Sequence, residues 1–357
     1  MGSEETRRKI IGEVREVKRV LVVRLSAFGD IIHSMHAVAG LRNALPHAEI
    51  GWLTSTKMAG LVKCACFVNN VHAVDTSGSP IRKIRNAVRI RDELAGRYDI
   101  TVDVQGLLKS AVVARLAGTG VLGYAGKESR ECSRFLYRWR VEPPVSAEHV
   151  VEKQAALLSG LAPVTPVRRL DLAVPEEDAK KALERFRWVE DGGYSVVHRR
   201  TRWPTKDLPG ELVVSITKML EGKGNKVVVT AADDTDAGEL AGFLKGTKAR
   251  VVRELSLPEL VWLYQKAELY IGPDTGPTHL ASALGIPTVA LYGPTDLKRN
   301  GPYGPRTVSI RPASDGCPPC WKKRCRKNHK GAATCISSIT VEDVMKAAEA
   351  VSGRGKA

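Results

Sequence analysis

The stretch 270–291 constrains the fold more than any other part of the chain. It begins as a short apolar strand, passes through the turn 272–276, opens a helix and ends in a second apolar strand at 286–291. A strand, a polar loop and a helix in this order are typical of an α/β sheet, which binds ligands at the loops that follow its strands. A turn with an ordinary helix cap would give the same residue types. The candidate ligand-binding residues of this stretch are Asp274, Thr275, Gly276 and His279.

Apolar strands alternate with helical segments in both halves of the chain, which predicts an α/β fold with parallel, doubly wound sheets. The expected strands are 18–25, 48–54, 71–75, 99–104, 194–198, 226–230, 251–252, 268–272 and 286–291. The Pro-containing stretch 161–166 is typical of a linker, so two domains are expected. The expected divisions are a basic leader 1–17, a first domain 18–166, a second domain 167–338 and a final segment 339–357, whose helix could fold back onto the first domain.

The chain carries a formal charge of +16 with a pI near 9.6, which calls for an anionic partner such as a phosphorylated substrate, an anionic membrane surface or nucleic acid. Aromatic residues make up only 5%, and no zinc-finger, helix-turn-helix or RNP pattern is present, so nucleic acid is not expected. The sequence contains no run of about 18 apolar residues, which is the length needed to span a bilayer. The charged N-terminus differs from a secretory signal, and we therefore expect a cytoplasmic protein.

The turn after the first expected strand contains Gly29 and Asp30. A carboxylate at the entry of the following helix stays ionised in the field of the helix dipole and could act as a general base towards a hydroxyl group. A plain N-cap would use the same residue.

Other polar residues also follow expected strands. Thr201 and Lys206 lie in a basic turn after strand 194–198 and could hold a diphosphate, although a solvated basic loop is the alternative. Asp236 follows strand 226–230, where an acid can accept hydrogen bonds from ribose or simply stabilise a helix N-terminus. Lys109 and Arg130 are cations at loop ends that could equally be solvated surface.

Four cysteines lie close together near the end of the chain. Their spacing could hold a structural zinc ion, with His329 as a substitute ligand, but a second CxxC pair is missing and thiols without metal are the alternative. These cysteines are Cys317, Cys320, Cys325 and Cys335.

The order of five motifs resembles glycosyltransferase family 9, and the likeness extends from about Arg19 to Val351. The motifs are RLSAFGDIIH at 24–33, QGLLKS at 105–110, WPTK at 203–206, DTGPTHL at 274–280 and YGPT at 292–295. The resemblance implies a GT-B fold, in which two Rossmann-like domains face each other across a cleft. The first would bind the acceptor and the second the nucleotide sugar.

The resemblance also implies an activity: inverting, metal-independent transfer of heptose from ADP-L-glycero-β-D-manno-heptose to a Kdo residue of the lipid A inner core, without a cofactor, at the cytoplasmic face of the inner membrane. Another nucleotide sugar or a later core acceptor is the first alternative, and a basic nucleic-acid-binding module the second. By motif, Asp30 would be the base, and Lys109 and Arg130 would contact the anionic acceptor. Thr201 and Lys206 would bind the diphosphate. The remaining donor contacts would be Asp236 to ribose, Asp274 to heptose hydroxyls, and Thr275, Gly276 and His279 to the phosphates and the adjoining sugar.

Overall fold

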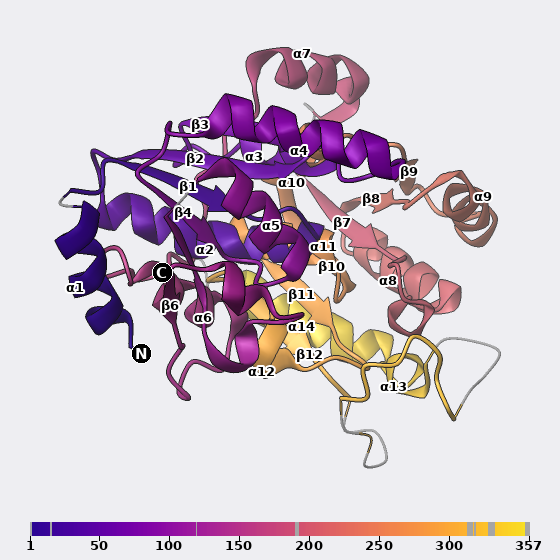
Figure 1. Cartoon of the computed structure of the whole chain (residues 1–357). Coiled ribbons are helices and arrows are strands. Elements are labelled where there is room, and N and C mark those ends of the chain that lie inside the picture. The colour runs from indigo at the N-terminus through magenta and orange to yellow at the C-terminus, as the bar shows by residue number, and fades with distance from the viewer. Residues whose placement is uncertain are drawn as a thin grey trace. The chain divides into compact units, whose positions relative to one another are not determined.

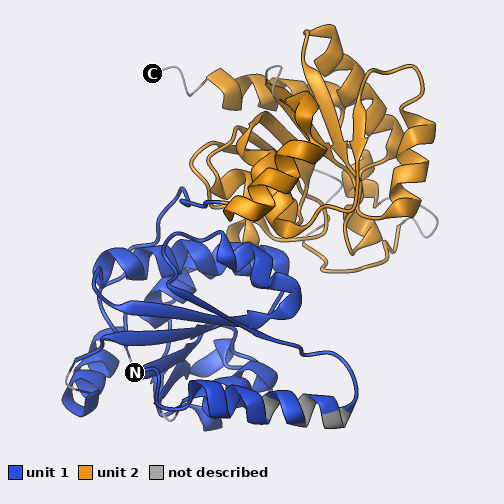
Figure 2. Cartoon of the chain, turned by 90° about the horizontal axis from the view of Figure 1, so that it is seen from above, with its two compact units in different colours: residues 1–173 blue, residues 174–357 orange. Residues whose placement is uncertain are grey.

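The computed structural model describes residues 2–14, 16–118, 120–189, 193–312, 317, 319–327 and 333–353. Within helix α4 it leaves the side chains of residues 80, 81, 83, 84 and 87 undescribed. The chain divides into two compact units, Met1–Ala173 and Val174–Ala357 (Figure 2). The division lies beyond the expected boundary at residue 166 because the segment after it still packs in unit 1, where the amide of Val167 donates to the carbonyl of His36 (3.1 Å).

Unit 1 is built on a six-stranded sheet in the order β3-β2-β1-β4-β5-β6, and every strand pair in it is parallel (Figure 1). The central strands are rich in β-branched residues and buried on both faces, as parallel strands between helices require. The strands are β1 Arg19–Val23, β2 Glu49–Ser55, β3 Asn70–Val74, β4 Ile100–Asp103, β5 Val121–Tyr124 and β6 Trp139–Val141. The helices are α1 Ser3–Val14, α2 Phe28–Ala44, α3 Thr56–Lys63, α4 Pro80–Leu94, α5 Leu108–Ala117 and α6 Val150–Leu158, with 3-10 turns η1 Gly126–Glu128 and η2 Ser133–Leu136.

Unit 2 repeats the plan with a parallel sheet in the order β12-β11-β10-β7-β8-β9. Its strands are β7 Tyr194–His198, β8 Lys226–Thr230, β9 Arg250–Val252, β10 Ala267–Pro273, β11 Thr288–Leu291 and β12 Thr307–Ile310. Its helices are α7 Glu176–Arg185, α8 Gly210–Gly222, α9 Asp234–Phe243, α10 Leu257–Gln265, α11 Gly276–Ala283, α12 Leu297–Asn300, α13 Thr334–Ser337 and α14 Val341–Gly353, with 3-10 turns η3 Arg187–Val189 and η4 Pro204–Lys206.

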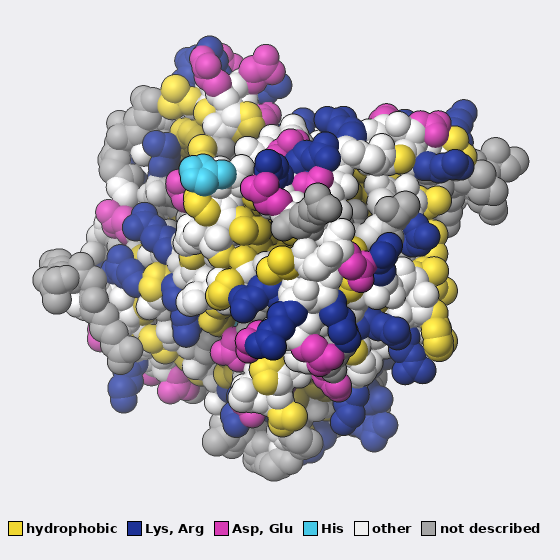
Figure 3. All heavy atoms as spheres, turned by 60° about the vertical axis from the view of Figure 1, so that its left-hand side comes forward, with side chains coloured by type: hydrophobic (Ala, Val, Ile, Leu, Met, Phe, Trp, Pro, Cys, Tyr) yellow, Lys and Arg dark blue, Asp and Glu magenta, His cyan; other side chains and the backbone are white. Residues whose placement is uncertain are grey.

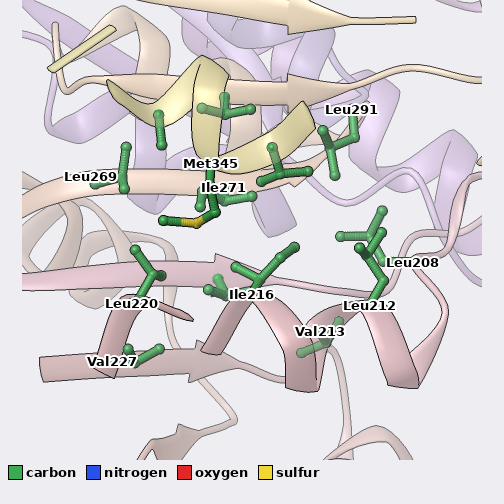
Figure 4. Packing of buried hydrophobic residues seen from close by; sticks show 14 of the residues in the cluster. Leu208, Leu212, Val213, Ile216, Leu220, Val227, Leu269, Ile271, Leu291 and Met345 are labelled. Carbon is green, nitrogen blue, oxygen red and sulfur yellow. The ribbon is translucent and has the colours of Figure 1, made fainter. Parts of the chain in front are cut away.

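The core of unit 2 joins helix α8 to the sheet and to the last helix of the chain. Figure 4 shows Ile216 and Leu220 of α8 near Ile271 of β10 and Met345 of α14, and all of these side chains are buried. The apolar face of α14 is thus packed within unit 2, whereas the sequence analysis considered packing on the first domain.

The α/β class with parallel sheets is confirmed. The segment expected to be a basic leader is mostly helix α1, whose Ile10 is buried and whose Thr6 hydroxyl donates to the carbonyl of Arg140 (2.9 Å). The part of α1 that is described therefore belongs to the body of unit 1. None of the described helices is both long enough and apolar enough to cross a bilayer.

Candidate active site

Sheet topology marks one place in each unit where a ligand can bind. In a parallel sheet wound in both directions from its first strand, loops diverge at the carboxyl ends of the strands on either side of the switch, and a crevice opens there. The switch lies between β1 and β4 in unit 1 and between β7 and β10 in unit 2. The candidate residues Asp30, Lys206 and Asp274 all follow one of these four strands.

In unit 2 the two loops at the switch are joined through Asp274, which is only 6% exposed. Its Oδ2 lies 2.6 Å from the Nζ of Lys206 and accepts a hydrogen bond from the Oγ1 of Thr295 at the same distance. Its Oδ1 lies 3.2 Å from the Nε2 of His279, in the first turn of α11. Three segments that are distant in sequence therefore converge on one carboxylate.

The electrostatics of this network favour the ionised carboxylate. Burial alone would raise the pKa of Asp274, but the hydrogen bonds and charges of His279 and Lys206 outweigh it and hold that pKa below its usual range. The ammonium group of Lys206 also lies 4.8 Å from the centre of the Trp203 ring, a cation–π contact that restrains it further. The result is an ordered arrangement of charges beside the first turn of α11.

Helix α11 begins with the motif that the sequence analysis singled out. Thr275 is its N-cap but makes no side-chain cap hydrogen bond, and Gly276 is the first helical residue. Unpaired amides at a helix N-terminus favour anions. Pro277 has no amide hydrogen, and the amides of Thr278 (3.0 Å) and His279 (3.2 Å) donate to the carbonyl of Thr275, so the amides of Thr275 and Gly276 are the ones that can bind an anion here. Thr275 and Gly276 are thus placed to bind phosphate or sugar oxygens next to Lys206.

Thr201 and Asp236 have different surroundings from those expected. The hydroxyl of Thr201 donates to the carbonyl of Trp203 (2.8 Å) and accepts from its amide (2.9 Å), so it is engaged in shaping the turn. Asp236 is fully buried, and its carboxylate is held by Arg199 (2.7 Å) and the amide of Ala232 (3.0 Å). Neither group is free to face a ligand without giving up these contacts.

The exposed acid of that cluster is Glu239, one turn further along α9. Its side chain is 39% exposed, and its carboxylate pairs with Arg199 (2.8 Å) and Arg200 (3.0 Å). Hydrogen bonding from Arg199 is the largest of the effects that lower the pKa of Glu239. Glu239 was not predicted from the sequence, since two acids three residues apart on a helix give no sign of which one is buried.

In unit 1, Asp30 lies in the first turn of α2 with its side chain 41% exposed. Its Oδ2 contacts Arg24 Nη2 (2.9 Å) and accepts from the amide of Ala27 (3.2 Å). Arg24 is almost fully buried and also donates to the carbonyl of Val104, so it ties the end of β1 to the end of β4. Within the described chain no hydrogen bond to Oδ1 of Asp30 is recorded, which leaves that oxygen available to a substrate hydroxyl.

The structure also brings Lys109 and Arg130 into one region. The amide of Arg130 donates to the carbonyl of Gly106 (2.9 Å), just ahead of Lys109 in α5, and both side chains are exposed. This loop is held by Asp103, a fully buried carboxylate that accepts hydrogen bonds from the hydroxyls of Ser110 (2.8 Å) and Tyr137 (2.8 Å). Burial raises the pKa of Asp103. Neither Asp103 nor the pairing of Arg24 with Asp30 was predicted from the sequence, although an acid at the end of a buried strand is a usable signal.

The four clustered cysteines line a single cavity of about 400 Å³. The cavity adjoins the site loops, since the Thr205 hydroxyl donates to the carbonyl of Lys322 (2.7 Å) and the amide of Trp321 to that of Pro294 (2.9 Å). Among the described residues, however, no three His, Cys, Asp or Glu side chains are grouped so as to hold a metal ion. His329 lies outside the described residues. The arrangement therefore gives the zinc expectation no support.

Comparison with known proteins decides the family. The model of "Glycosyltransferase family 9 (heptosyltransferase)" matches residues 87–330, more than half of the chain. The lipopolysaccharide heptosyltransferase 1 of Pseudomonas aeruginosa is 32% identical over 328 residues, which cover 86% of this chain and 87% of the relative. The chain belongs to glycosyltransferase family 9. This confirms the resemblance drawn from the five motifs, and it makes the protein an enzyme that transfers a glycosyl group.

Solved structures support the fold of this family 9 enzyme. A family 9 glycosyltransferase from Veillonella parvula superposes with a TM-score of 0.78 at 21% identity, covering 95% of this chain and 98% of that one. A heptosyltransferase of Escherichia coli, determined with ADP-2-deoxy-2-fluoro heptose, has a TM-score of 0.71 at 24% identity and covers 92% and 98% of the two chains. The two parallel six-stranded sheets are those of the GT-B class.

Proposed function

We propose that this family 9 enzyme transfers heptose from ADP-L-glycero-β-D-manno-heptose to a Kdo residue of the lipopolysaccharide inner core. The observation that carries the proposal is the network of Lys206, Asp274, His279 and Thr295 at the switch of unit 2. A cation beside a helix N-terminus would suit a departing diphosphate, and in this proposal the carboxylate of Asp274 exchanges part of its present contacts for the hydroxyls of the sugar. The names of the relatives support heptose as the sugar and lipopolysaccharide as the acceptor.

The reaction divides into two tasks. Oδ1 of Asp30 removes the proton of the acceptor hydroxyl as its oxygen forms a bond to the anomeric carbon of heptose. The bond from that carbon to the diphosphate oxygen breaks on the opposite side, and ADP departs with the electron pair. Lys206 and the backbone amides of Thr275 and Gly276 stabilise the developing phosphate charge without a metal ion. Arg24 keeps the base oriented, while Lys109 and Arg130 bind acidic groups of the acceptor.

The direct test measures ADP release from ADP-heptose in the presence of a chelator, with and without a Kdo-terminated lipid A acceptor. We expect ADP release that requires the acceptor, with one heptosylated product formed for each ADP released. A product made only from a UDP- or GDP-linked sugar would assign another donor. Transfer only to an acceptor that already carries heptose would assign a later step of core assembly.

We further propose that Glu239, rather than the buried Asp236, accepts hydrogen bonds from the ribose of ADP. The change Glu239→Gln is expected to weaken ADP binding about 5- to 30-fold, because a charge-assisted hydrogen bond contributes about 1–2 kcal/mol. The change Asp236→Asn is expected to lower the unfolding midpoint instead, since it leaves Arg199 less well paired in the interior. Calorimetric titration with ADP and thermal unfolding of both variants separate the two roles. If Asp236→Asn lost ADP affinity and Glu239→Gln lost only stability, Asp236 would be the ribose contact instead.

Because the acceptor is lipid-linked, the enzyme would work at the anionic cytoplasmic face of the inner membrane. The net charge of +16 supports such a location.

A further inference from the structure

Large apolar side chains are exposed together on one layer of unit 1. Phe135 of η2 is 71% exposed, and Leu108 and Val112 of α5 and Val88 of α4 are exposed by more than a third of their surface. Helix α5 contacts both α4 and η2, and Figure 1 draws α4 and α5 beside each other over the sheet. Apolar side chains that gather on neighbouring elements, rather than being scattered singly, mark an interaction surface.

The orientation of α5 follows from its sequence. Ala111, Ala114 and Ala117 are buried against the sheet, and Ala114 and Ala117 are one turn apart on that inner side. Leu108, Val112 and Arg115 recur at the same helical spacing on the opposite side. The outward stripe is therefore apolar in its first two turns and basic in its last.

The 3-10 turn η2 is fixed beside the start of α5. The hydroxyl of Ser133 donates to the carbonyl of Gly106 (3.1 Å), and the amide of Leu108 donates to the carboxylate of Glu131 (3.3 Å). Tyr137, just after η2, donates to the buried Asp103 (2.8 Å). Phe135 is thus exposed on a turn that these hydrogen bonds fix in place.

Cations surround these apolar side chains. The guanidinium carbon of Arg134 lies 5.0 Å from the centre of the Phe135 ring. Acidic neighbours are fewer: Glu131, Asp92 and Glu93, the last paired with Arg89 (3.8 Å). We call the whole set the basic apolar surface; its members are Val88, Leu108, Val112 and Phe135 with Arg85, Lys109, Arg115, Arg130 and Arg134. On the face drawn in Figure 3, Lys and Arg side chains lie among hydrophobic and acidic ones.

We propose that the basic apolar surface docks on an anionic lipid bilayer, with Phe135, Val112 and Leu108 inserted among the lipid headgroups. Apolar side chains enter the boundary between headgroups and acyl chains while long basic side chains remain with the phosphates. A second copy of this chain fits the surface poorly, because two faces rich in arginine would repel each other. Nucleic acid would engage the cations but leave the aliphatic side chains exposed.

This inference deepens the proposed function by naming the surface that meets the membrane. Its physiological role rests on that function, since Lys109 and Arg130, the proposed acceptor contacts, lie within the surface. Lipid binding itself does not rest on it, because it is measured without any sugar substrate. The two hypotheses can therefore fail separately.

The test is flotation of the full chain with vesicles of phosphatidylglycerol and phosphatidylethanolamine, compared with vesicles of phosphatidylcholine alone. We expect binding to the anionic vesicles, weakened by salt, and a loss of about 10-fold or more in the double variant Val112→Ser/Phe135→Ser. The matched control Val145→Ser/Leu183→Ser removes two exposed aliphatic side chains from other places and should bind as the wild type does. Both double variants should keep their activity on a deacylated acceptor.

A second measurement does not depend on losing a side chain. The variant Phe135→Trp should show added fluorescence that is quenched by lipids brominated in their acyl chains, whereas Val145→Trp should not. Equal vesicle binding by the wild type and Val112→Ser/Phe135→Ser would overturn the proposal, as would self-association through this surface in the absence of lipid. Absence of quenching at residue 135 would also overturn it.

Discussion

Replacing Asp30 by asparagine is expected to lower kcat for glycosyl transfer about 10³-fold while the affinity for the nucleotide sugar stays within about twofold. Asparagine has nearly the same shape and can still accept the hydrogen bond from the amide of Ala27, so the start of α2 is retained. What it lacks is the capacity to take a proton from the acceptor. Initial rates at saturating substrate, together with donor titration by calorimetry, measure the two quantities separately.

The matched control for this variant is Asp99→Asn. Asp99 pairs with Arg19 (2.6 Å), as Asp30 pairs with Arg24, but at the amino ends of the strands, away from the switch of the sheet. The Asp99→Asn variant should be somewhat less stable than the wild type, with a kcat within about threefold of the wild-type value. If Asp30→Asn kept more than a tenth of the wild-type kcat, another group would have to be the base, and the two variants would then differ little.

The sequence predicted those strands whose apolar runs are bounded by turn residues. Strands β7 and β8 were predicted at the residues where they occur, because Gly193 and Asn225 precede strongly β-branched runs. Strands β5, β6 and β12 were missed. Each has only three or four residues, and β6 and β12 lie at sheet edges, where packing on a neighbouring strand decides the conformation more than local sequence does.

The candidate site was predictable to the extent that strand order decides it. Asp30, Lys206 and Asp274 stood out because polar residues after parallel strands gather at one edge of a sheet. Their partners were not predictable: Thr295 is 21 residues beyond Asp274 in the chain, yet its hydroxyl lies 2.6 Å from that carboxylate. Burial was equally hidden, since nothing local indicates that Asp236 is turned inward and Glu239 outward.

The change Asp274→Asn should cause the largest loss of stability of any single substitution at the site. It leaves the ammonium group of Lys206 in a largely buried position without its counter-ion, and breaking such a pair costs about 3–5 kcal/mol. Urea unfolding at pH 7 is expected to show a loss of that size. The control Glu177→Gln, an exposed acid on α7, should change the free energy of unfolding by less than about 0.5 kcal/mol.

The pH dependence of that loss identifies its electrostatic origin. The pKa of Asp274 is depressed in the folded state, so its charge contributes stability that is complete above the pKa of an unfolded carboxyl group, about 4, and is lost as the pH falls towards the folded pKa. The difference in the free energy of unfolding between wild type and Asp274→Asn should therefore narrow below about pH 4, for as long as both proteins remain folded. A difference that stayed the same under acid conditions would mean that asparagine disturbs packing around Thr295 and His279, and the ion pair with Lys206 would then be no source of stability.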